Sequence, residues 1–315
     1  MNFKLLASPL QGFTDFRFRN AFNKYFGGID TFYAPYIRIK GKLQIRRAYQ
    51  QDIDPENNSS LKLIPQIMTN NAEEFIFVAK HIQQLGYKEL NWNLGCPYPM
   101  VTKRGMGSGL INDPEKIDSI LKKVHAESEI IVSVKMRLGY EKHDEILRVL
   151  PVLNNYPIKN IAIHPRLGKQ LYKGDVDLDS FQRCIDNTDH ILYYNGDIAS
   201  VANFNEMAKR FPTIDHWMLG RGLIADPFLP GMIKNNTSKY PKNRIKQFRK
   251  FHDTLLHDYA EALSGASHIL MRMFTFWEYF ITSFPKSQKR LVKIKRTKNI
   301  DAYEKAVSDI LDGEL

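Results

Sequence analysis

One segment of the chain combines a cysteine with glycines in a way that suits chemistry on a ligand. Residues 90–114 read LNWNLGCPYPMVTKRGMGSGLINDP, and Cys96 is followed by Gly105, Gly107 and Gly109. Glycine permits unusual backbone torsions and close approach to a planar ligand, and a thiol can donate a proton near neutral pH. A lone cysteine is more often a small buried hydrophobe. Its place in a Gly-Cys-Pro loop beyond a strand favours a chemical role for Cys96.

Polar residues recur where the apolar runs of the chain end. Gln66, Asn93, Lys135, His164 and Asn195 each lie at the C-terminal end of a predicted strand. Barrel enzymes assemble their active sites at that edge of the sheet. Five such residues at successive strands predict one shared site.

The elements that must position these residues alternate along the first 230 residues or so. Helical stretches include Asn71–Leu85, which Gly86 ends, and Asp113–Lys123, which begins with an Asp cap followed by proline. Ser200–Arg210 and Asp226–Ile233 have similar starts. Eight strand–helix units predict an α/β fold, a (β/α)8 TIM barrel, with a doubly wound open sheet as the alternative. The expected strands, rich in branched or aromatic residues, are Phe3–Ala7, Thr31–Ala34, Lys62–Ile67, Glu89–Asn93, Ile130–Lys135, Asn160–His164, His190–Tyr194 and His216–Leu219.

Beyond Pro230 the pattern becomes purely helical. A polar stretch at 235–243 contains Pro241 and is typical of a boundary. We therefore expect a barrel domain over residues 1–235 and a smaller, all-helical domain over residues 243–315. The segments with helical periodicity are 243–263, 267–284 and 301–311.

The charge of the chain points to a polyanionic partner. Lys and Arg number 45 against 34 Asp and Glu, a net charge of +11. Residues 230–315 hold 16 basic and 9 acidic residues, and the run 286–298 (KSQKRLVKIKRTK) holds seven basic residues and no acid. For this run alone, a solvated helix face and a phosphate-binding surface are even alternatives.

Other classes of protein are disfavoured by composition. The two cysteines, Cys96 and Cys184, lie in dissimilar contexts, and nine histidines are scattered, so we expect neither a disulfide framework nor a metal site. No run approaches the roughly 18 apolar residues of a membrane span, and the N-terminus has no signal-peptide design. We expect a cytoplasmic protein without membrane contact.

Six short blocks occur along the chain in a fixed order at the predicted strand ends. They are Ser8–Arg17 (SPLQGFTDFR), Leu90–Pro97 (LNWNLGCP), Val134–Gly139 (VKMRLG), His164–Arg166 (HPR), Tyr194–Asp197 (YNGD) and Leu219–Gly222 (LGRG). Each block alone is a weak pattern. Together the six resemble the tRNA-dihydrouridine synthase family, FMN-dependent and bacterial in type, over nearly the whole chain.

The resemblance implies a flavoprotein oxidoreductase that reduces the C5–C6 double bond of a D-loop uridine in tRNA, with FMN bound and NADPH as reductant. Hydride would pass from flavin N5 to uracil C6, and Cys96 would donate the proton to C5. Lys135 would neutralise the N1–C2=O edge of the reduced flavin. Gln66 would hydrogen-bond the flavin ring, and the backbone of Pro9 and Leu10 would contact it.

The resemblance also implies a place for the phosphate of FMN. Asn195, Gly196 and Asp197 after the seventh strand, with Gly220 and Arg221 after the eighth, would supply backbone N–H groups and one guanidinium.

Further residues are implied to contact flavin or substrate. His164 would contact the flavin, and Arg166 would contact the uracil or the RNA. Asn93 would orient the target base, since an amide both donates and accepts. Arg38 is a further candidate for RNA contact.

A uracil inside folded tRNA must be extruded to reach a site in a barrel. Phosphate contacts from the helical domain can fix the register, and the preferred stretch is Lys286–Lys298, with Lys289, Arg290 and Lys293. Most aromatic residues of this domain are expected in its core rather than stacked on bases: Phe274, Phe276, Trp277, Tyr279 and Phe280.

The chain departs from the family pattern at Ser8 and Leu10, where Ala and Met are commoner, and at two further places that bear on the site. His164-Pro165-Arg166-Leu167 stands where His-Gly-Arg-Thr is more usual, so one backbone donor toward the phosphate is missing. The segment at Ala34-Pro35 lacks the usual Thr-Glu, which weakens the transfer of roles to that loop.

Two other functions remain as alternatives. An FMN barrel dehydrogenase of free pyrimidines, similar to dihydroorotate dehydrogenase, would leave the basic helical domain unexplained. A noncatalytic RNA-binding protein would leave Cys96, Lys135 and Gln66 unexplained. A monomer is expected, and the choice between uridine 16 and uridine 20 stays open.

Overall fold

The computed structural model describes residues 3–314, which form two compact units interleaved along the chain. The first unit contains the chain up to Gly12, Asp30–Gly196 and Ala208–Leu219. The second contains Phe13–Ile29, Asp197–Met207 and the chain from Gly220 onward. The simpler division into domains at 1–235 and 243–315 stays a prediction.

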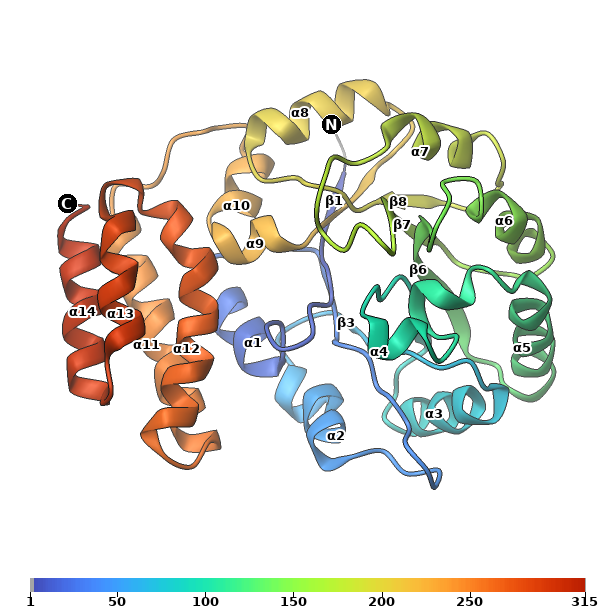
Figure 1. Ribbon diagram of the computed structural model, residues 1–315, viewed down its shortest axis with the longest axis horizontal. Coiled ribbons are helices and arrows are strands. Elements are labelled where there is room, and N and C mark those ends of the chain that lie inside the picture. The colour runs from blue at the N-terminus through green and yellow to red at the C-terminus, as the bar shows by residue number, and fades with distance from the viewer. Residues whose placement is uncertain (1–2, 315) are drawn as a thin grey trace. The chain divides into compact units, whose positions relative to one another are not determined.

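The first unit is built on a closed ring of parallel strands (Figure 1). Over the described residues the order is β3-β2-β1-β9-β8-β7-β6-β5-β4. Pro65 separates β3 from β4 because it has no N–H to donate to a ladder, so the two are halves of one strand that closes the ring. The strands are β1 Lys4–Ala7, β2 Thr31–Tyr33, β3 Leu63–Ile64, β4 Gln66–Ile67, β5 Glu89–Leu94, β6 Ile131–Gly139, β7 Ile161–Leu167, β8 Leu192–Tyr194 and β9 His216–Leu219.

The predicted barrel is thereby confirmed, with one strand at each of the eight expected places. β6 and β7 run further than expected because they continue to pair with each other, Arg137 opposite His164 and Gly139 opposite Leu167. As a result Arg137 and Arg166 belong to strands rather than to loops.

Helices accompany the strands, and their starts follow the expected cap chemistry. Asn71 Oδ1 accepts a hydrogen bond from Glu74 N at 3.1 Å, and Asp113 Oδ1 accepts one from Lys116 N at 3.0 Å. Pro114 occupies the first helical position of α5. These helices are α2 Arg47–Ile53, α3 Ala72–Gln84, α4 Pro99–Thr102, α5 Pro114–Glu127, α6 Ile146–Asn154, α7 Leu178–Ile185 and α8 Val201–Arg210, with 3₁₀ turns η1 Glu56–Asn58 and η2 Gly107–Leu110.

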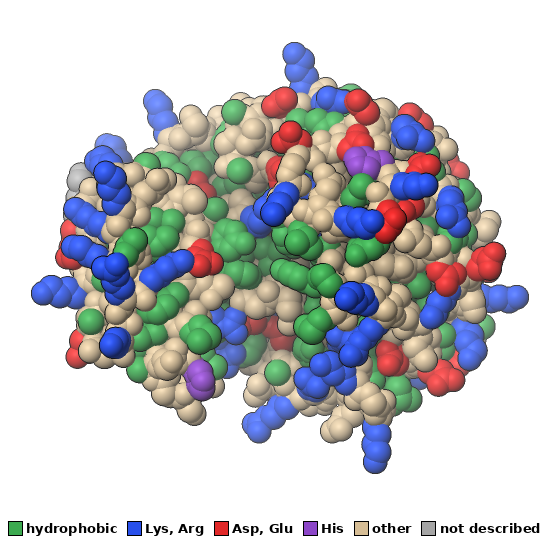
Figure 2. Space-filling model, viewed as in Figure 1, with side chains coloured by type: hydrophobic (Ala, Val, Ile, Leu, Met, Phe, Trp, Pro, Cys, Tyr) green, Lys and Arg blue, Asp and Glu red, His purple; other side chains and the backbone are tan. Residues whose placement is uncertain are grey.

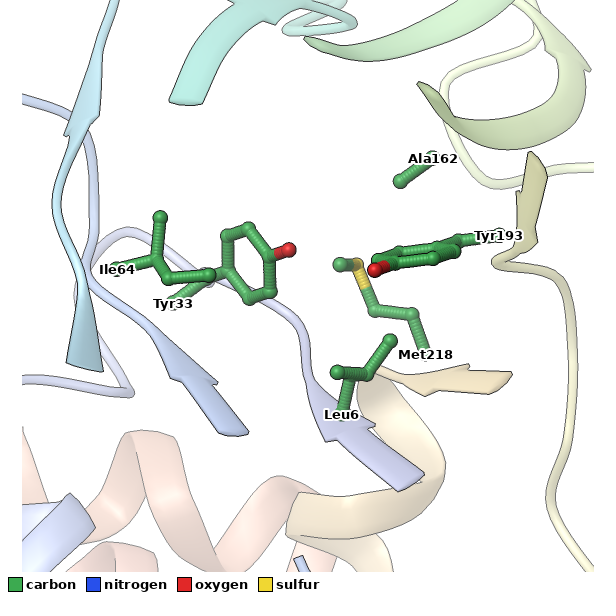
Figure 3. Packing of buried hydrophobic residues seen from close by; sticks show 6 residues of the cluster. All are labelled: Leu6, Tyr33, Ile64, Ala162, Tyr193 and Met218. Carbon is green, nitrogen blue, oxygen red and sulfur yellow. The ribbon is translucent and has the colours of Figure 1, made fainter. Parts of the chain in front are cut away.

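A layer of apolar side chains fills the interior of the barrel below the strand ends (Figure 3). Side chains alternate along a strand, so the next inward residue after Ala162 is His164, and the next after Tyr193 is Asn195. The interior therefore changes from apolar packing to polar groups toward the C-terminal ends of the strands. The layer consists of Leu6, Tyr33, Ile64, Ala162, Tyr193 and Met218.

The second unit is helical, and in Figure 1 its four C-terminal helices, α11 to α14, lie side by side. Phe276, Trp277 and Phe280 are fully buried, which confirms their expected place in a core. No helix within residues 3–314 is both long and apolar enough to cross a membrane. The helices of this unit are α8 as far as Met207, α1 Phe16–Tyr25, α9 Arg221–Ala225, α10 Leu229–Lys234, α11 Arg244–Ala262, α12 Ala266–Phe280, α13 Leu291–Arg296 and α14 Ile300–Asp312, with 3₁₀ turns η3 Ile281–Ser283 and η4 Pro285–Arg290.

Candidate functional site

A ladder of buried amides crosses three neighbouring strands of the barrel. Gln66 Nε2 on β4 donates to Asn91 Oδ1 on β5 at 2.7 Å, and Asn91 Nδ2 donates to Ser133 Oγ on β6 at 2.9 Å. Asn93 Nδ2 donates back to Gln66 Oε1 at 2.8 Å. Amides suit this place because each can donate and accept at once. The ladder fixes both Gln66 and Asn93, two of the predicted site residues.

The oxygen of Asn93 holds the start of the loop that carries Cys96. Asn93 Oδ1 accepts hydrogen bonds from Gly95 N at 3.0 Å and Cys96 N at 2.9 Å. Gly107, at φ +55°, passes directly over the cysteine, and a β-carbon there would lie 2.6 Å from Cys96 O. Ser108 N also donates to Cys96 O at 3.0 Å. The glycine-rich segment therefore folds back on the cysteine itself.

Cys96 is buried in a mixed environment. Met68, Val101 and Met106 pack around it. Burial raises the pKa of its thiol, while the Tyr98 backbone N–H, the Tyr36 hydroxyl and the charges of Arg137 and Arg38 lower it in part. The thiol is therefore protonated at neutral pH, as a proton donor must be.

Lys135 lies opposite Asn93 in the register of β5 and β6. Its side chain is enclosed by the barrel yet keeps some accessible surface. Burial, with a smaller effect of the Arg137 charge, lowers the pKa of Lys135 to about 7. Within residues 3–314 its Nζ has no hydrogen-bond or ion-pair partner. An enclosed amine without an acceptor suits an anionic or acceptor group of a ligand.

Arg137 is a site residue that the sequence analysis did not single out. Its Nε donates to Gly95 O at 3.1 Å and its Nη1 donates to Leu167 O at 2.7 Å, and the residue is buried. It thus ties the cysteine loop to the end of β7. Its presence in the block Val134–Gly139 was the signal that could have identified it.

His164 and Arg166 lie together at the end of β7. Arg166 Nη1 lies 3.2 Å from His164 Nε2, and because a guanidinium only donates, that imidazole nitrogen must accept. Arg166 Nη2 also donates to Gly174 O at 2.5 Å, and both residues are buried. Pro165 O accepts a hydrogen bond from Asp177 N at 2.8 Å. The predicted contacts of His164 with flavin and of Arg166 with uracil or RNA stay predictions.

In the first unit, the remaining predicted flavin contacts lie at strand ends. Pro9 and Leu10, after β1, are partly exposed. Asn195 Nδ2, after β8, donates to Met218 O at 2.7 Å. A β-carbon at Gly196 would lie 2.8 Å from the Tyr194 hydroxyl oxygen, so glycine is required there.

In the second unit, the other predicted phosphate residues form an ion pair. Arg221 Nη2 lies 2.8 Å from Asp197 Oδ1. Asp197 adopts φ +37°, a left-handed conformation uncommon for a residue other than glycine. Such strain clusters at functional sites. The assignment of Asp197, Gly220 and Arg221 to a phosphate site stays a prediction.

The basic run 286–298 folds as η4 and α13, and two of its own residues, Ser287 and Ile294, are buried. Figure 2 shows Lys and Arg side chains gathered over the C-terminal helices. Arg290 Nη1 donates to Asp309 O, and Lys293 Nζ lies 3.9 Å from Asp309 Oδ2. Lys289 is exposed and unpaired within the described residues. The three predicted RNA-binding residues therefore differ in how much charge they leave free.

A second basic segment, in the first unit, was largely missed by the sequence analysis. Residues 38–47 contain Arg38, Lys40, Lys42, Arg46 and Arg47, and no acidic residue occurs between Asp30 and Asp52. The backbone beside Arg38 follows β4, since Ile37 N donates to Gln66 O at 2.7 Å. The five cations of this segment are visible in the sequence, but they form a shorter run than the seven cations of residues 286–298.

No group of three His, Cys, Asp or Glu side chains that could hold a metal ion occurs in the part of the chain from residue 3 to residue 314.

The described residues form a (β/α)8 barrel that carries a thiol and an enclosed lysine at neighbouring strand ends. Two solved reductases have a similar fold. 2-Naphthoyl-CoA reductase has a TM-score of 0.55 at 12% identity, covering 75% of this chain and 50% of that one. A mutant of morphinone reductase has a TM-score of 0.54 at 8% identity, covering 74% and 86%.

The chain belongs to the dihydrouridine synthase (Dus) family, which matches residues 5–308. It is 27% identical over 293 residues to a probable tRNA-dihydrouridine synthase of Staphylococcus aureus, covering 84% of this chain and 86% of the relative. It is also 25% identical over 325 residues to probable tRNA-dihydrouridine synthase 2 of Bacillus subtilis, covering 98% and 95%. The family resemblance drawn from the six sequence blocks is thereby confirmed.

Proposed function

We propose that this chain is a tRNA-dihydrouridine synthase, which reduces the C5–C6 double bond of a uridine in tRNA, with bound FMN and with NADPH as reductant. The observation that carries the proposal is the convergence of a protonated thiol, Cys96, and an enclosed amine without an acceptor, Lys135, at neighbouring strand ends. Family membership supports the same reaction.

The residues of the barrel fit FMN. Lys135 would hold the N1–C2=O edge of the isoalloxazine, and Gln66 would hydrogen-bond the ring from the amide ladder. Pro9, Leu10 and His164 would line the ring. Phosphate binding is proposed for Asn195 and Gly196 of the first unit, and separately for Asp197, Gly220 and Arg221 of the second unit. When bound, FMN supplies the hydride that the C6 carbon of the uracil receives.

Cys96 supplies the proton. Its raised thiol pKa keeps the proton on sulfur until charge develops on the uracil ring. Asn93 holds the backbone of Gly95 and Cys96, and Arg137 holds the carbonyl of Gly95. The thiol is thus positioned by groups that bind the backbone rather than the sulfur, and general-acid catalysis of this kind is worth about 10²- to 10⁴-fold.

tRNA would be held through its phosphates. Lys286–Lys298 is proposed to contact the phosphate backbone, mainly through cations that are unpaired within the described residues, such as Lys289, and to a smaller extent through Arg290 and Lys293, which already interact with Asp309. Arg38 is proposed to contact RNA near the site. Contacts of this kind can offset the few kcal/mol needed to extrude a base. We further propose that the protein acts as a cytoplasmic monomer.

The proposal is tested on purified, flavin-containing protein with unmodified tRNA and NADPH under anaerobic conditions. Flavin reoxidation is followed, and dihydrouridine is mapped by reverse-transcription stops. We expect a new dihydrouridine at one D-loop position, lost in Cys96→Ala while reduction of the flavin by NADPH persists. Flavin that is reduced but never reoxidised by tRNA would overturn the proposal and favour free pyrimidines as substrates.

A further inference from the structure

Tyr36 is fixed next to the cysteine by the backbone on its C-terminal side. Ile37 pairs with Ile67, and its N–H and carbonyl bond Gln66 O at 2.7 Å and Met68 N at 3.0 Å. The Tyr36 ring packs, partly buried, against the cluster that Met68, Cys96, Val101 and Met106 form. Its position therefore depends on the same strand, β4, that supports the amide ladder.

The hydroxyl of Tyr36 lies close enough to the packed sulfur of Cys96 that it lowers the pKa of the thiol, while the sulfur raises the pKa of the phenol. Burial raises the pKa of Tyr36 well above that of a free phenol, and the nearby sulfur adds to the effect. The phenol therefore keeps its proton at every pH at which the enzyme would work. Toward a thiolate it can act only as a donor.

A buried thiol that gives up its proton leaves a thiolate in apolar surroundings, which is costly without hydrogen bonds. Among residues 3–314, two donors lower the pKa of this thiol and so favour its thiolate: the Tyr98 backbone N–H and the Tyr36 hydroxyl. The charged groups that act on the sulfur without bonding to it are Arg38, Arg137 and Lys135. Only the Tyr36 hydroxyl can be removed without changing a charge or the backbone.

We propose that Tyr36 is a positioning residue for the general acid: its hydroxyl orients the thiol of Cys96 and stabilises the thiolate left by proton transfer. In that step the S–H bond breaks, a C5–H bond forms, and the electron pair remains on sulfur. The O–H bond of Tyr36 stays intact, and solvent restores the thiol proton. The identity of the proton acceptor rests on the function proposed above; the contact between hydroxyl and sulfur does not.

The first test is the pH dependence of Cys96 alkylation by iodoacetamide in the FMN-bound protein without tRNA, read on the Cys96 peptide so that Cys184 does not interfere. Tyr36→Phe keeps the ring and removes the donor, so the midpoint should rise by about one pH unit. The rise should persist at 1 M salt, because the contact of the hydroxyl with the thiol is short-range and buried and salt screens chiefly exposed charges. An unchanged midpoint would overturn the proposal.

Tyr98→Phe is the matched control. Tyr98 is two residues from Cys96 and half-exposed, and it acts on the pKa of the thiol through its backbone N–H rather than its hydroxyl, so this variant should titrate like the parent protein. A rise as large as that of Tyr36→Phe would mean that any tyrosine change in the region loosens the loop, and would overturn the proposal.

The second test is single-turnover transfer from pre-reduced protein to unmodified tRNA. Tyr36→Phe should slow this step by about 3- to 10-fold and leave flavin reduction by NADPH and the melting temperature unchanged. An unchanged rate of transfer would count against the role of Tyr36. If the parent protein itself transfers nothing to tRNA, the proposed function fails, while the alkylation shift still decides the contact of Tyr36 with Cys96.

Discussion

The two basic segments of the molecule use their charges differently. In the run 286–298, Arg290 and Lys293 interact with Asp309, and Lys295 Nζ lies 2.7 Å from Glu278 Oε1. In the segment 38–47, none of the five cations has an ion pair within the described residues. The longer run therefore has fewer unpaired cations than its composition suggests. In the shorter segment every cation is without an ion pair in the described residues.

A count of cations therefore overstates the charge available to a polyanion. Helix packing in the second unit brings carboxylates and carbonyl groups of α12 and α14 to the basic run. Residues 38–46 follow Tyr36 in the loop before α2, and Arg38 is near enough to Cys96 to lower the pKa of its thiol, so the segment begins close to the candidate site. We therefore expect the shorter segment to contribute more to tRNA binding per residue.

The largest effect is expected from reversing charge in the shorter segment. The triple variant Lys40→Glu, Lys42→Glu, Arg47→Glu should weaken tRNA binding by about 10- to 100-fold at 0.1 M salt and reduce the salt slope by about 3, because three phosphate contacts become repulsive. Fluorescence anisotropy over a range of salt concentrations measures both, and flavin absorbance confirms that FMN stays bound. Affinity within twofold of the parent would remove the segment from the binding surface.

A matched reversal in the longer run should have a smaller effect. Lys286→Glu, Lys289→Glu, Lys298→Glu changes net charge by the same amount at exposed residues without ion pairs in the described chain. We expect binding weakened by about 3- to 10-fold. Because total charge is identical in the two triple variants, a loss larger than that of the first would reverse the comparison.

The paired lysines of the longer run should matter less still. Lys293→Gln and Lys295→Gln each remove a charge that already faces a carboxylate. Exposed pairs contribute about 0–1 kcal/mol, so affinity should change less than about threefold in the same anisotropy assay. A tenfold loss would show that these side chains leave their partners to bind RNA.

The smallest effect on binding is expected at Arg290, whose guanidinium donates to the last turns of α14. Arg290→Gln should lower the free energy of unfolding by about 1 kcal/mol and lower the melting temperature by a few degrees, with affinity within twofold. Circular dichroism melting and the binding assay separate the two quantities. A normal melting temperature with weakened binding would assign Arg290 to the RNA surface instead.

The strands were predictable because apolar runs indicate buried strands. The location of the candidate site at the C-terminal ends of these strands was predictable because polar residues follow the apolar runs there. Gln66, Asn93 and Lys135 were identified in this way. The partners of these residues were not predictable, since Asn93 to Gln66 and Arg137 to Leu167 join atoms that meet only when the barrel closes. Tyr36 was not predictable either. In the sequence it is an aromatic residue without a motif, and only the pairing of Ile37 with β4 places it beside Cys96.

The contact of Gly107 with Cys96 has a consequence for how this enzyme can diversify. The backbone of the loop closes on the cysteine at both ends, through Asn93 and through Gly107 and Ser108. Between these points the chain bulges outward, and Tyr98 and Met100 are 52% and 80% exposed. Substitutions at the outward positions can reshape what the loop meets without moving the sulfur. Exposed positions of this loop can therefore change in evolution while the placement of the proposed proton donor is kept.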